Sequence, residues 1–311
     1  MRIRWVSLVI GLALNVAGAV AARAGDFPQE LVSWEPAAPG AVFQGEGGAA
    51  WDRKIRERGF IRVVGKEWKL WYTGYNEERS PLKSLGLATS TDGLVWTRNP
   101  SNPIHAASWT EDVWVGEVNG GYVMFAEGAN DVAHLMTSRD GIAWTDHGPL
   151  DVRRKDGTPI SAGPYGTPTG WYENGQWYLF YERGDLGVWL AKLDGANRWV
   201  NVQDTPVLEL GPGPYDRGAV AMNQVIRRDG VYYAFYHAAA ERPWKEWTSC
   251  IARSHDLIHW EKYAGNPIVR ENCSSPILVE RPEGDRLYTM HPSVRVFRPR
   301  RPTGSEAGGR P

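Results

Sequence analysis

A pair of short apolar strands, followed by a turn and a tryptophan, recurs four times along the chain. The strands are rich in valine, isoleucine and aromatic residues and are bounded by glycine, asparagine, aspartate or proline, a pattern typical of strands joined by tight turns. The pairs span Gly59–Tyr75, Val113–Gly128, Pro168–Gly184 and Ala221–His237. No long segment shows the period of an amphipathic helix. The pattern therefore predicts an all-β fold.

The tryptophans that follow these strand pairs set the period of the repeat. They are Trp96, Trp144, Trp199 and Trp260. Their spacings of 48, 55 and 61 residues match a four-stranded propeller blade with loops of variable length. A fifth, shorter copy spans Ser275–His291. Five copies predict a five-bladed β-propeller, in which the four tryptophans pack between blades.

Two further features are expected to be architectural. An aspartate precedes each tryptophan in a turn, where its carboxylate can accept backbone N–H bonds. These residues are Asp92, Asp140, Asp194 and Asp256. Ring closure is expected to need one blade shared by both ends of the chain, because an open ring would expose two strand edges. We expect Leu31–Phe43 to supply the outer strand beside Val294–Phe297.

The first residues indicate where the protein works. Met1–Ala24 begins with two arginines, continues as an apolar run, and ends in the small-x-small pattern that signal peptidase reads. We therefore predict a signal peptide at 1–24 with cleavage near Gly25, and a secreted or periplasmic protein. A retained membrane anchor is the alternative. No other span is apolar enough to cross a bilayer.

Residues 25–298 are expected to form one propeller domain, acting as a monomer, and the Arg-, Pro- and Gly-rich tail at 299–311 to be disordered. The formal net charge of −1, without a long basic block, makes nucleic acid a poor candidate partner. Cys250 and Cys273 could form a disulfide in an oxidising compartment. Two cysteines without a paired ligand pattern do not indicate zinc, and no metal or cofactor is expected.

Chemistry is expected where the copies differ at positions that the fold makes equivalent. In an antiparallel pair, the start of the first strand and the end of the second lie at the same edge of the sheet. The ends of the second strands are Tyr75, Glu127, Glu182, His237 and His291. The approaches to the first strands offer Asp52, Glu57, Glu111, Asp112, Tyr165, Thr167, Asp216, Arg217, Ser274 and Ser275. One rim of the central pit is thus predicted to gather carboxylates, histidines and an arginine.

Such a rim fits hydrolysis of a glycosidic bond. One carboxyl group must be protonated to give its proton to the leaving oxygen, and another must be ionised to act as base or nucleophile. Crowded carboxylates in a desolvated pit are pushed apart in pKa, which produces this division of roles. The 16 tryptophans and 13 tyrosines also offer flat faces for sugar rings, although most must be core. Carbohydrate is therefore the expected partner.

The repeat resembles that of the five-bladed propeller glycosidases, including glycoside hydrolase families 43 and 32 and their relatives. The resemblance rests on WKLWYTGY followed by SLGLATSTDGLVW, and on GQWYLFYERGD and GVYYAFYH, and it covers roughly Trp51–Arg298. These motifs belong to the scaffold, so they are specific for the fold and suggestive for the activity. The resemblance implies an exported glycoside hydrolase.

Families of this kind place an aspartate before the first strand of each of the first two blades and a glutamate before that of the third. The nearest matches to the two aspartates are Asp52, with Glu57 as a competitor, and Asp112, with Glu111 beside it. The third blade departs from the pattern, because it offers Tyr165 and Thr167 instead of a glutamate. Glu182, at the adjacent strand end, is the evident substitute.

The resemblance implies that Glu182 is the general acid and Asp52 the base or nucleophile, while Asp112 keeps Glu182 protonated or orients it. The residues expected to contact substrate are Glu111, Glu127, Tyr165, Thr167, Arg183, Asp216, Arg217, His237 and His291. Structural alternatives are a turn cap for Asp52, a salt bridge between Glu182 and Arg183, and hydrogen-bonded core positions for the histidines.

Two other functions stay open. The first is a non-catalytic glycan-binding propeller, which would keep the aromatic rim without the geometry of paired carboxylates. The second is a glycoside phosphorylase, in which Arg183, Arg217, His237 or His291 would bind phosphate. Dependence of the reaction on phosphate separates this alternative from hydrolysis.

Overall fold

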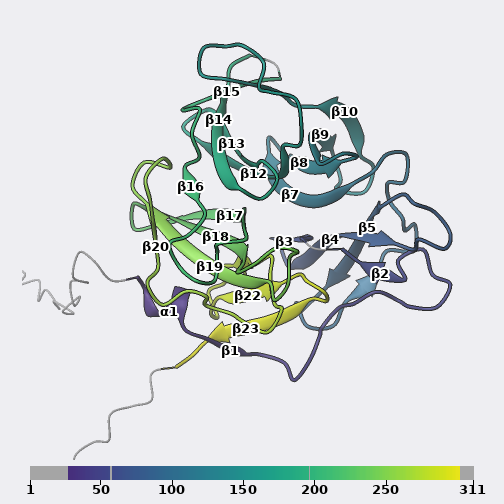
Figure 1. Ribbon diagram of the computed structural model, residues 1–311. Helices are drawn as coiled ribbons and strands as arrows, with labels where there is room; N and C mark the ends of the chain where they lie inside the picture. Colours follow the sequence, from purple (N-terminus) through teal and green to yellow (C-terminus); the bar gives the residue numbers. More distant parts are fainter. Residues whose placement is uncertain (1–26, 57, 196, 302–311) are drawn as a thin grey trace, which may run out of the picture.

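Five small sheets stand around a common axis in the computed structural model, which describes residues 27–56, 58–195 and 197–301 (Figure 1). Consecutive segments of the chain form consecutive blades, so the five-bladed β-propeller predicted from the repeat is confirmed. The expected signal peptide at 1–24 and Glu57 lie outside the described residues. Within the described ranges, no helix is long and apolar enough to cross a membrane.

The strands of each blade follow the chain. Blade 1 contains β2 (Lys54–Ile55), β3 (Phe60–Val64), β4 (Glu67–Tyr75), β5 (Ser84–Ser90) and β6 (Thr97–Arg98). Blade 2 contains β7 (Glu111–Val118), β8 (Gly121–Gly128), β9 (Val132–Ser138) and β10 (Thr145–Pro149). Blade 3 contains β11 (Asp151–Arg153), β12 (Gly166–Glu173), β13 (Gln176–Glu182), β14 (Gly187–Leu193), β15 (Arg198–Asn201) and β16 (Leu208–Glu209). Blade 4 contains β17 (Ala219–Arg228), β18 (Val231–Ala239), β19 (Thr248–Ser254) and β20 (Trp260–Lys262).

Blade 5 is shared between the two ends of the described chain. It contains β21 (Ile277–Val279), β22 (Arg286–Thr289), β23 (Arg295–Pro299) and, from the other end, β1 (Trp34–Pro36), which follows the short helix α1 (Gln29–Val32). In β1, Trp34 pairs with Pro299 and Pro36 with Phe297, and Phe43 bridges to Val294. The expected ring closure is therefore confirmed, and β23 reaches one residue into the tail expected to be disordered.

The turn tryptophans fill the spaces between blades. Trp144 and Trp199 are buried. The Trp144 ring lies edge-on to Trp71 of blade 1, and Trp199 lies edge-on to Phe125 of blade 2. Trp96 and Trp260 are half-buried, so the expected burial is complete for two of the four.

The turn aspartates before these tryptophans act as caps. Asp92, Asp140 and Asp256 each accept two backbone N–H bonds from residues two and three positions further on. Their architectural role is therefore confirmed. Asp194 differs, because its carboxylate pairs with Arg198 at 2.5 Å.

The two cysteines remain free thiols, so the disulfide considered above does not form. Cys250 packs in a cluster with Phe180, whereas Cys273 packs in a separate cluster with Leu278. Ser249, the neighbour of Cys250 on β19, is the residue that donates to the Cys273 carbonyl. Because successive side chains of a strand point to opposite faces, Cys250 faces away from Cys273.

A bulge interrupts the innermost strand pair near the axis in blades 2, 3 and 4. The register shifts lie between Glu111 and Trp114, between Gly166 and Thr169, and between Met222 and Gln224. Residues at or beside the corresponding positions have positive φ in four blades, namely Arg58 (32°), Asp112 (47°), Thr167 (43°) and Ser275 (59°). Bulges of this kind re-aim side chains next to functional sites. In blades 2 and 3 the bulges place Thr167 and Asp112 in hydrogen-bond contact.

Candidate functional site

Two buried glutamates mark the centre of the candidate site. Glu127 is the penultimate residue of β8, opposite Glu111, and Glu182 ends β13 opposite Gly166. His237 occupies the same place in blade 4, opposite Ala221. The edge argument from the sequence thus finds equivalent positions in three blades, and the side chains of all three are almost fully buried.

Gly166 makes room for both glutamates. A Cβ atom added there would lie 2.1 Å from Glu127 Oε2 and 3.0 Å from Glu182 Oε1, so both carboxyl groups face this one residue. The next residue, Thr167, donates its N–H to Glu127 Oε2 at 2.8 Å and its hydroxyl to Asp112 Oδ2 at 3.3 Å. The third blade therefore lacks a glutamate before its first strand because carboxyl groups from two neighbouring strand ends already occupy that space.

Burial raises the pKa of all three acids that lie near Gly166 and Thr167. It raises the pKa of Glu182 to about 8, an effect that nearby Asp185 increases. Burial likewise raises the pKa of Glu127 well above its ordinary value, with Asp112 and Glu111 adding to the effect. The pKa of Asp112 is also raised by burial, and the Arg58 guanidinium opposes that shift. Glu182 therefore holds a proton at neutral pH.

Glu111 differs from its neighbours because cations compensate its charge. Its Oε2 lies 2.6 Å from Lys83 Nζ and 3.1 Å from Arg56 Nε, and its Oε1 accepts the Trp109 indole N–H at 2.9 Å. One oxygen each of Glu111, Glu127 and the exposed Asp131 lie within 4.8 Å of one another, a spacing that a cation could bridge. Lys83 and Arg56 already supply positive charge to Glu111, so these contacts explain the cluster without an ion.

Arg58 reaches the axis as a fully buried guanidinium. It donates to the carbonyl of Asp112 at 2.7 Å, to that of Met222 at 2.9 Å, and to that of Pro168. It also donates to the Thr167 carbonyl. Burial lowers its pKa to about 10, which leaves it charged at neutral pH. No local sequence pattern indicates this role, because the partners of Arg58 come from three other blades.

The two histidines are neutral hydrogen-bonding groups near the axis. Burial lowers the pKa of His237 to about 3 and that of His291 to about 4. The Nδ1 atom of His237 lies 3.1 Å from Asn223 Nδ2 and 3.4 Å from Ser275 Oγ. Neutral imidazoles can exchange hydrogen bonds with sugar hydroxyls, but they lack the charge that attracts phosphate.

Asp52 and Asp216 occupy another repeated place, in contact with the outermost strands. Asp52 Oδ2 accepts from Tyr72 at 3.0 Å and from Arg98 of β6 at 2.8 Å. Asp216 Oδ2 accepts from Lys262 of β20 at 2.5 Å. Both side chains are fully buried in these pairs. The structure thus brings Asp112, but neither of these two aspartates, to the glutamates.

Two further residues expected to contact substrate, Tyr165 and Arg183, make hydrogen bonds to loop carbonyls. The Tyr165 hydroxyl donates to the Leu150 carbonyl at 3.0 Å, and its N–H donates to the Asp131 carbonyl. Arg183 donates to the Ser161 carbonyl at 2.8 Å and to the Pro164 carbonyl. Arg217 is exposed.

The loop between β18 and β19 adds residues that the sequence analysis missed. Arg242 donates to the Gly184 and Gly218 carbonyls, and its guanidinium lies 5.4 Å from the Trp244 ring centroid. Trp244 also hydrogen-bonds to Asp185, which follows Glu182 by three residues. The loop therefore covers the edge of blade 3 beside the general-acid candidate.

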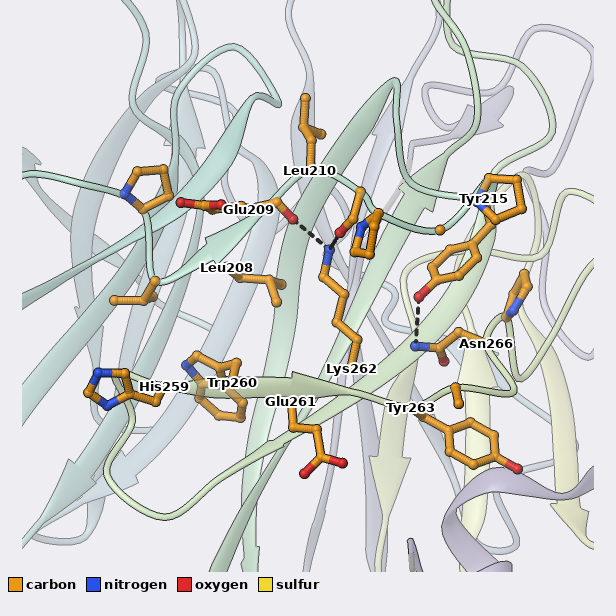
Figure 2. A pocket seen from close by; sticks show the side chains of 18 of the residues that line it. Leu208, Glu209, Leu210, Tyr215, His259, Trp260, Glu261, Lys262, Tyr263 and Asn266 are labelled. Carbon is orange, nitrogen blue, oxygen red and sulfur yellow. Dashed lines mark hydrogen bonds between the residues drawn. The ribbon is translucent and has the colours of Figure 1, made fainter. Parts of the chain in front are cut away.

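A groove of about 1240 Å³ lies elsewhere, between β16 and β20 (Figure 2). Figure 2 shows Lys262 reaching the Glu209 carbonyl across the groove, and Asn266 bonded to Tyr215. The groove follows the outer edge of blade 4. None of the residues that line it belongs to the carboxyl cluster, which consists of Glu111, Asp112, Glu127 and Glu182.

Comparison with known proteins shows the fold alone. No family model matches the sequence, and no curated protein matches it. Among solved structures, one from Parabacteroides distasonis assigned as a glycoside hydrolase aligns over 86% of this chain and 96% of its own, with a TM-score of 0.69 and 16% identity. A glycosyl hydrolase from Bacteroides ovatus aligns over 88% and 95%, with a TM-score of 0.68 and 16% identity. The β-1,2-mannobiose phosphorylase from Listeria innocua aligns over 83% and 93%, with a TM-score of 0.63 and 14% identity.

Proposed function

We propose that the protein is an exported glycoside hydrolase that uses paired carboxyl groups in the central pit. The observation that carries the proposal is the pair of buried glutamates facing Gly166, one of which has a pKa of about 8. A glycosidase needs such a group to remain protonated at working pH. The similar structures from P. distasonis and B. ovatus support a glycan-active enzyme.

In this proposal Glu182 is the general acid and donates its proton to the oxygen of the leaving sugar. Asp112 is the base that takes a proton from water, because it contacts Thr167 beside the glutamates and the Arg58 guanidinium opposes the rise in its pKa that burial causes. Asp112 replaces Asp52 in this role, since the contacts of Asp52 are with the outer strand. Glu127 lies beside both groups, and burial raises its pKa well above the ordinary value.

A screen of the purified protein against polysaccharides and aryl glycosides, with and without phosphate, tests the proposal. Without phosphate, the wild type should release sugars from at least one glycan. Glu182→Gln should slow cleavage of that glycan by about 10² to 10⁴ and spare an aryl glycoside whose leaving group departs unprotonated. Asp112→Asn should slow both substrates, whereas Asp52→Asn should slow neither more than its loss of stability explains.

Three results would contradict this assignment. Cleavage only in the presence of phosphate would identify a phosphorylase, a possibility kept open by the similar structure from L. innocua. Glycan binding without any cleavage would identify a binding protein. A loss of activity in Asp52→Asn but not in Asp112→Asn would restore Asp52 as the base.

A further inference from the structure

A second cavity, of about 400 Å³, lies between the start of blade 1 and the end of blade 5. Its charged and aromatic lining consists of Arg53, Lys54, Arg56, Tyr75 and His291. Among the described residues that line it, none is acidic. Its volume falls in the range of about 300 to 1,000 Å³ that is typical of small-molecule sites. Three cations around one cavity favour an anionic group.

Two of the three cations, Arg53 and Lys54, make ion pairs with exposed glutamates. Arg53 pairs with Glu78, and Lys54 Nζ lies 3.4 Å from Glu77 Oε2. The side chains of these glutamates are about three-quarters exposed. Exposed ion pairs contribute little free energy, so a ligand carboxylate can replace either glutamate at small cost.

The cavity adjoins the candidate active site through two residues. Arg56 lines the cavity and also lies 3.1 Å from Glu111 in the carboxyl cluster. His291 also lines the cavity, and it lies close enough to His237 at the axis to contribute to the lowered pKa of that imidazole. A sugar bound at the glutamates would therefore have its neighbour within reach of this cavity.

We infer that this cavity is a subsite for the carboxylate of an acidic sugar, next to the bond that the protein cleaves. This inference rests on the proposed function and names its substrate class, a uronate-containing glycan. Arginine binds carboxylates through two parallel N–H bonds, and Arg53 offers that fork. Tyr75, whose ring lies 5.7 Å from Lys54 Nζ, provides a flat face for the sugar ring.

Binding measured by calorimetry in a Glu182→Gln background tests the subsite without requiring cleavage. The probes are a panel of galacturonate- and glucuronate-containing oligosaccharides, each with its carboxyl-reduced counterpart. At low salt, one acidic oligosaccharide should bind at least about tenfold more tightly than its reduced form. A factor of about ten is what one charge-assisted hydrogen bond contributes to affinity. Arg53→Gln/Lys54→Gln should remove this preference, so that the acidic and reduced forms bind equally.

Lys66→Gln is the matched control, because Lys66 is an exposed cation in the turn at the opposite end of β4 from Tyr75. It should keep the full preference.

Equal affinity for acidic and reduced oligosaccharides, or a preference that survives in Arg53→Gln/Lys54→Gln, would overturn the subsite. Inorganic phosphate that binds there in place of an acidic sugar would overturn it too. An acidic glycan that binds but is never cleaved by the wild type contradicts the hydrolase alone, and cleavage restricted to neutral glycans contradicts the subsite alone.

Discussion

Gly166 determines where the carboxyl groups of the site can lie. The space that a side chain at Gly166 would fill is occupied by the carboxyl groups of Glu127 from blade 2 and Glu182 from blade 3. The φ angle of Gly166 is not positive, so the requirement at this position concerns space and not backbone conformation. A family pattern that expects a glutamate before this strand therefore finds its carboxylate one strand away.

Gly166→Ala should consequently impair catalysis more than folding. The new Cβ would displace the carboxyl group of Glu127 or Glu182, and a shift of about 1 Å can cost about 10² in rate. Glycan cleavage should fall by about that factor, while the thermal midpoint should change little. Gly40→Ala is the control, because a Cβ at Gly40 meets no atom within 4 Å. Similar activity in both variants would show that the two glutamates are not positioned for chemistry.

Glu182 also predicts a pH dependence. Its pKa is about 8 in the folded protein, against about 4.3 in an unfolded chain. Because the folded state holds the proton more tightly, its stabilising contribution is complete below pH about 4.3 and is lost as pH rises through about 8. Cleavage should decline over that alkaline range too, since the acid must be protonated. Glu182→Gln should flatten the fall in free energy of unfolding, measured in urea; parallel curves would contradict the raised pKa.

At the scale of strands and loops, the sequence predicted positions that depend on the repeat and missed those that depend on loops. The ends of β8, β13 and β18 follow from periodicity, which is why Glu127, Glu182 and His237 could be predicted. The contacts of Asp52 and Asp216 with the outermost strands could not be foreseen, because the length of chain before a strand does not say which way a side chain reaches. Arg58 could not be foreseen, since its partners lie 54 to 164 residues away.

The loop between β18 and β19 carries a prediction of its own. Trp244 is 48% exposed and is tied to Asp185 beside Glu182, so its ring is placed to stack on a sugar at the mouth of the pit. Trp244→Ala should raise KM for an oligosaccharide by roughly tenfold with little change in kcat, and Trp244→Phe should restore most of it. Tyr172→Ala is the control, because Tyr172 is similarly exposed at the other end of β12 from Gly166. An equal effect of both variants would argue against stacking.

Two sets of contacts join the blades into a ring, one at the outer rim and one at the axis. At its rim, β1 pairs with β23 and joins the two ends of the described chain in one blade. At its axis, Arg58 of blade 1 donates to carbonyls of blades 2, 3 and 4. The same guanidinium holds Asp112 and Thr167, so the contacts that join the blades also orient the carboxyl cluster.

Replacing Arg58 should therefore destabilise the ring as a unit. Arg58→Met would leave several buried carbonyls without a donor and Asp112 without its nearest compensating charge, a change that typically costs about 3 to 5 kcal/mol. Arg62→Met is the matched control on β3, because among the described residues the Arg62 side chain makes one hydrogen bond, of 3.3 Å, to the Val115 carbonyl. It should cost about 1 kcal/mol. Both values can be measured by urea unfolding, and Arg58→Lys should fall between them, since lysine keeps the charge but not the planar fork. Equal stabilities of Arg58→Met and Arg62→Met would show that the axial guanidinium does not join the blades.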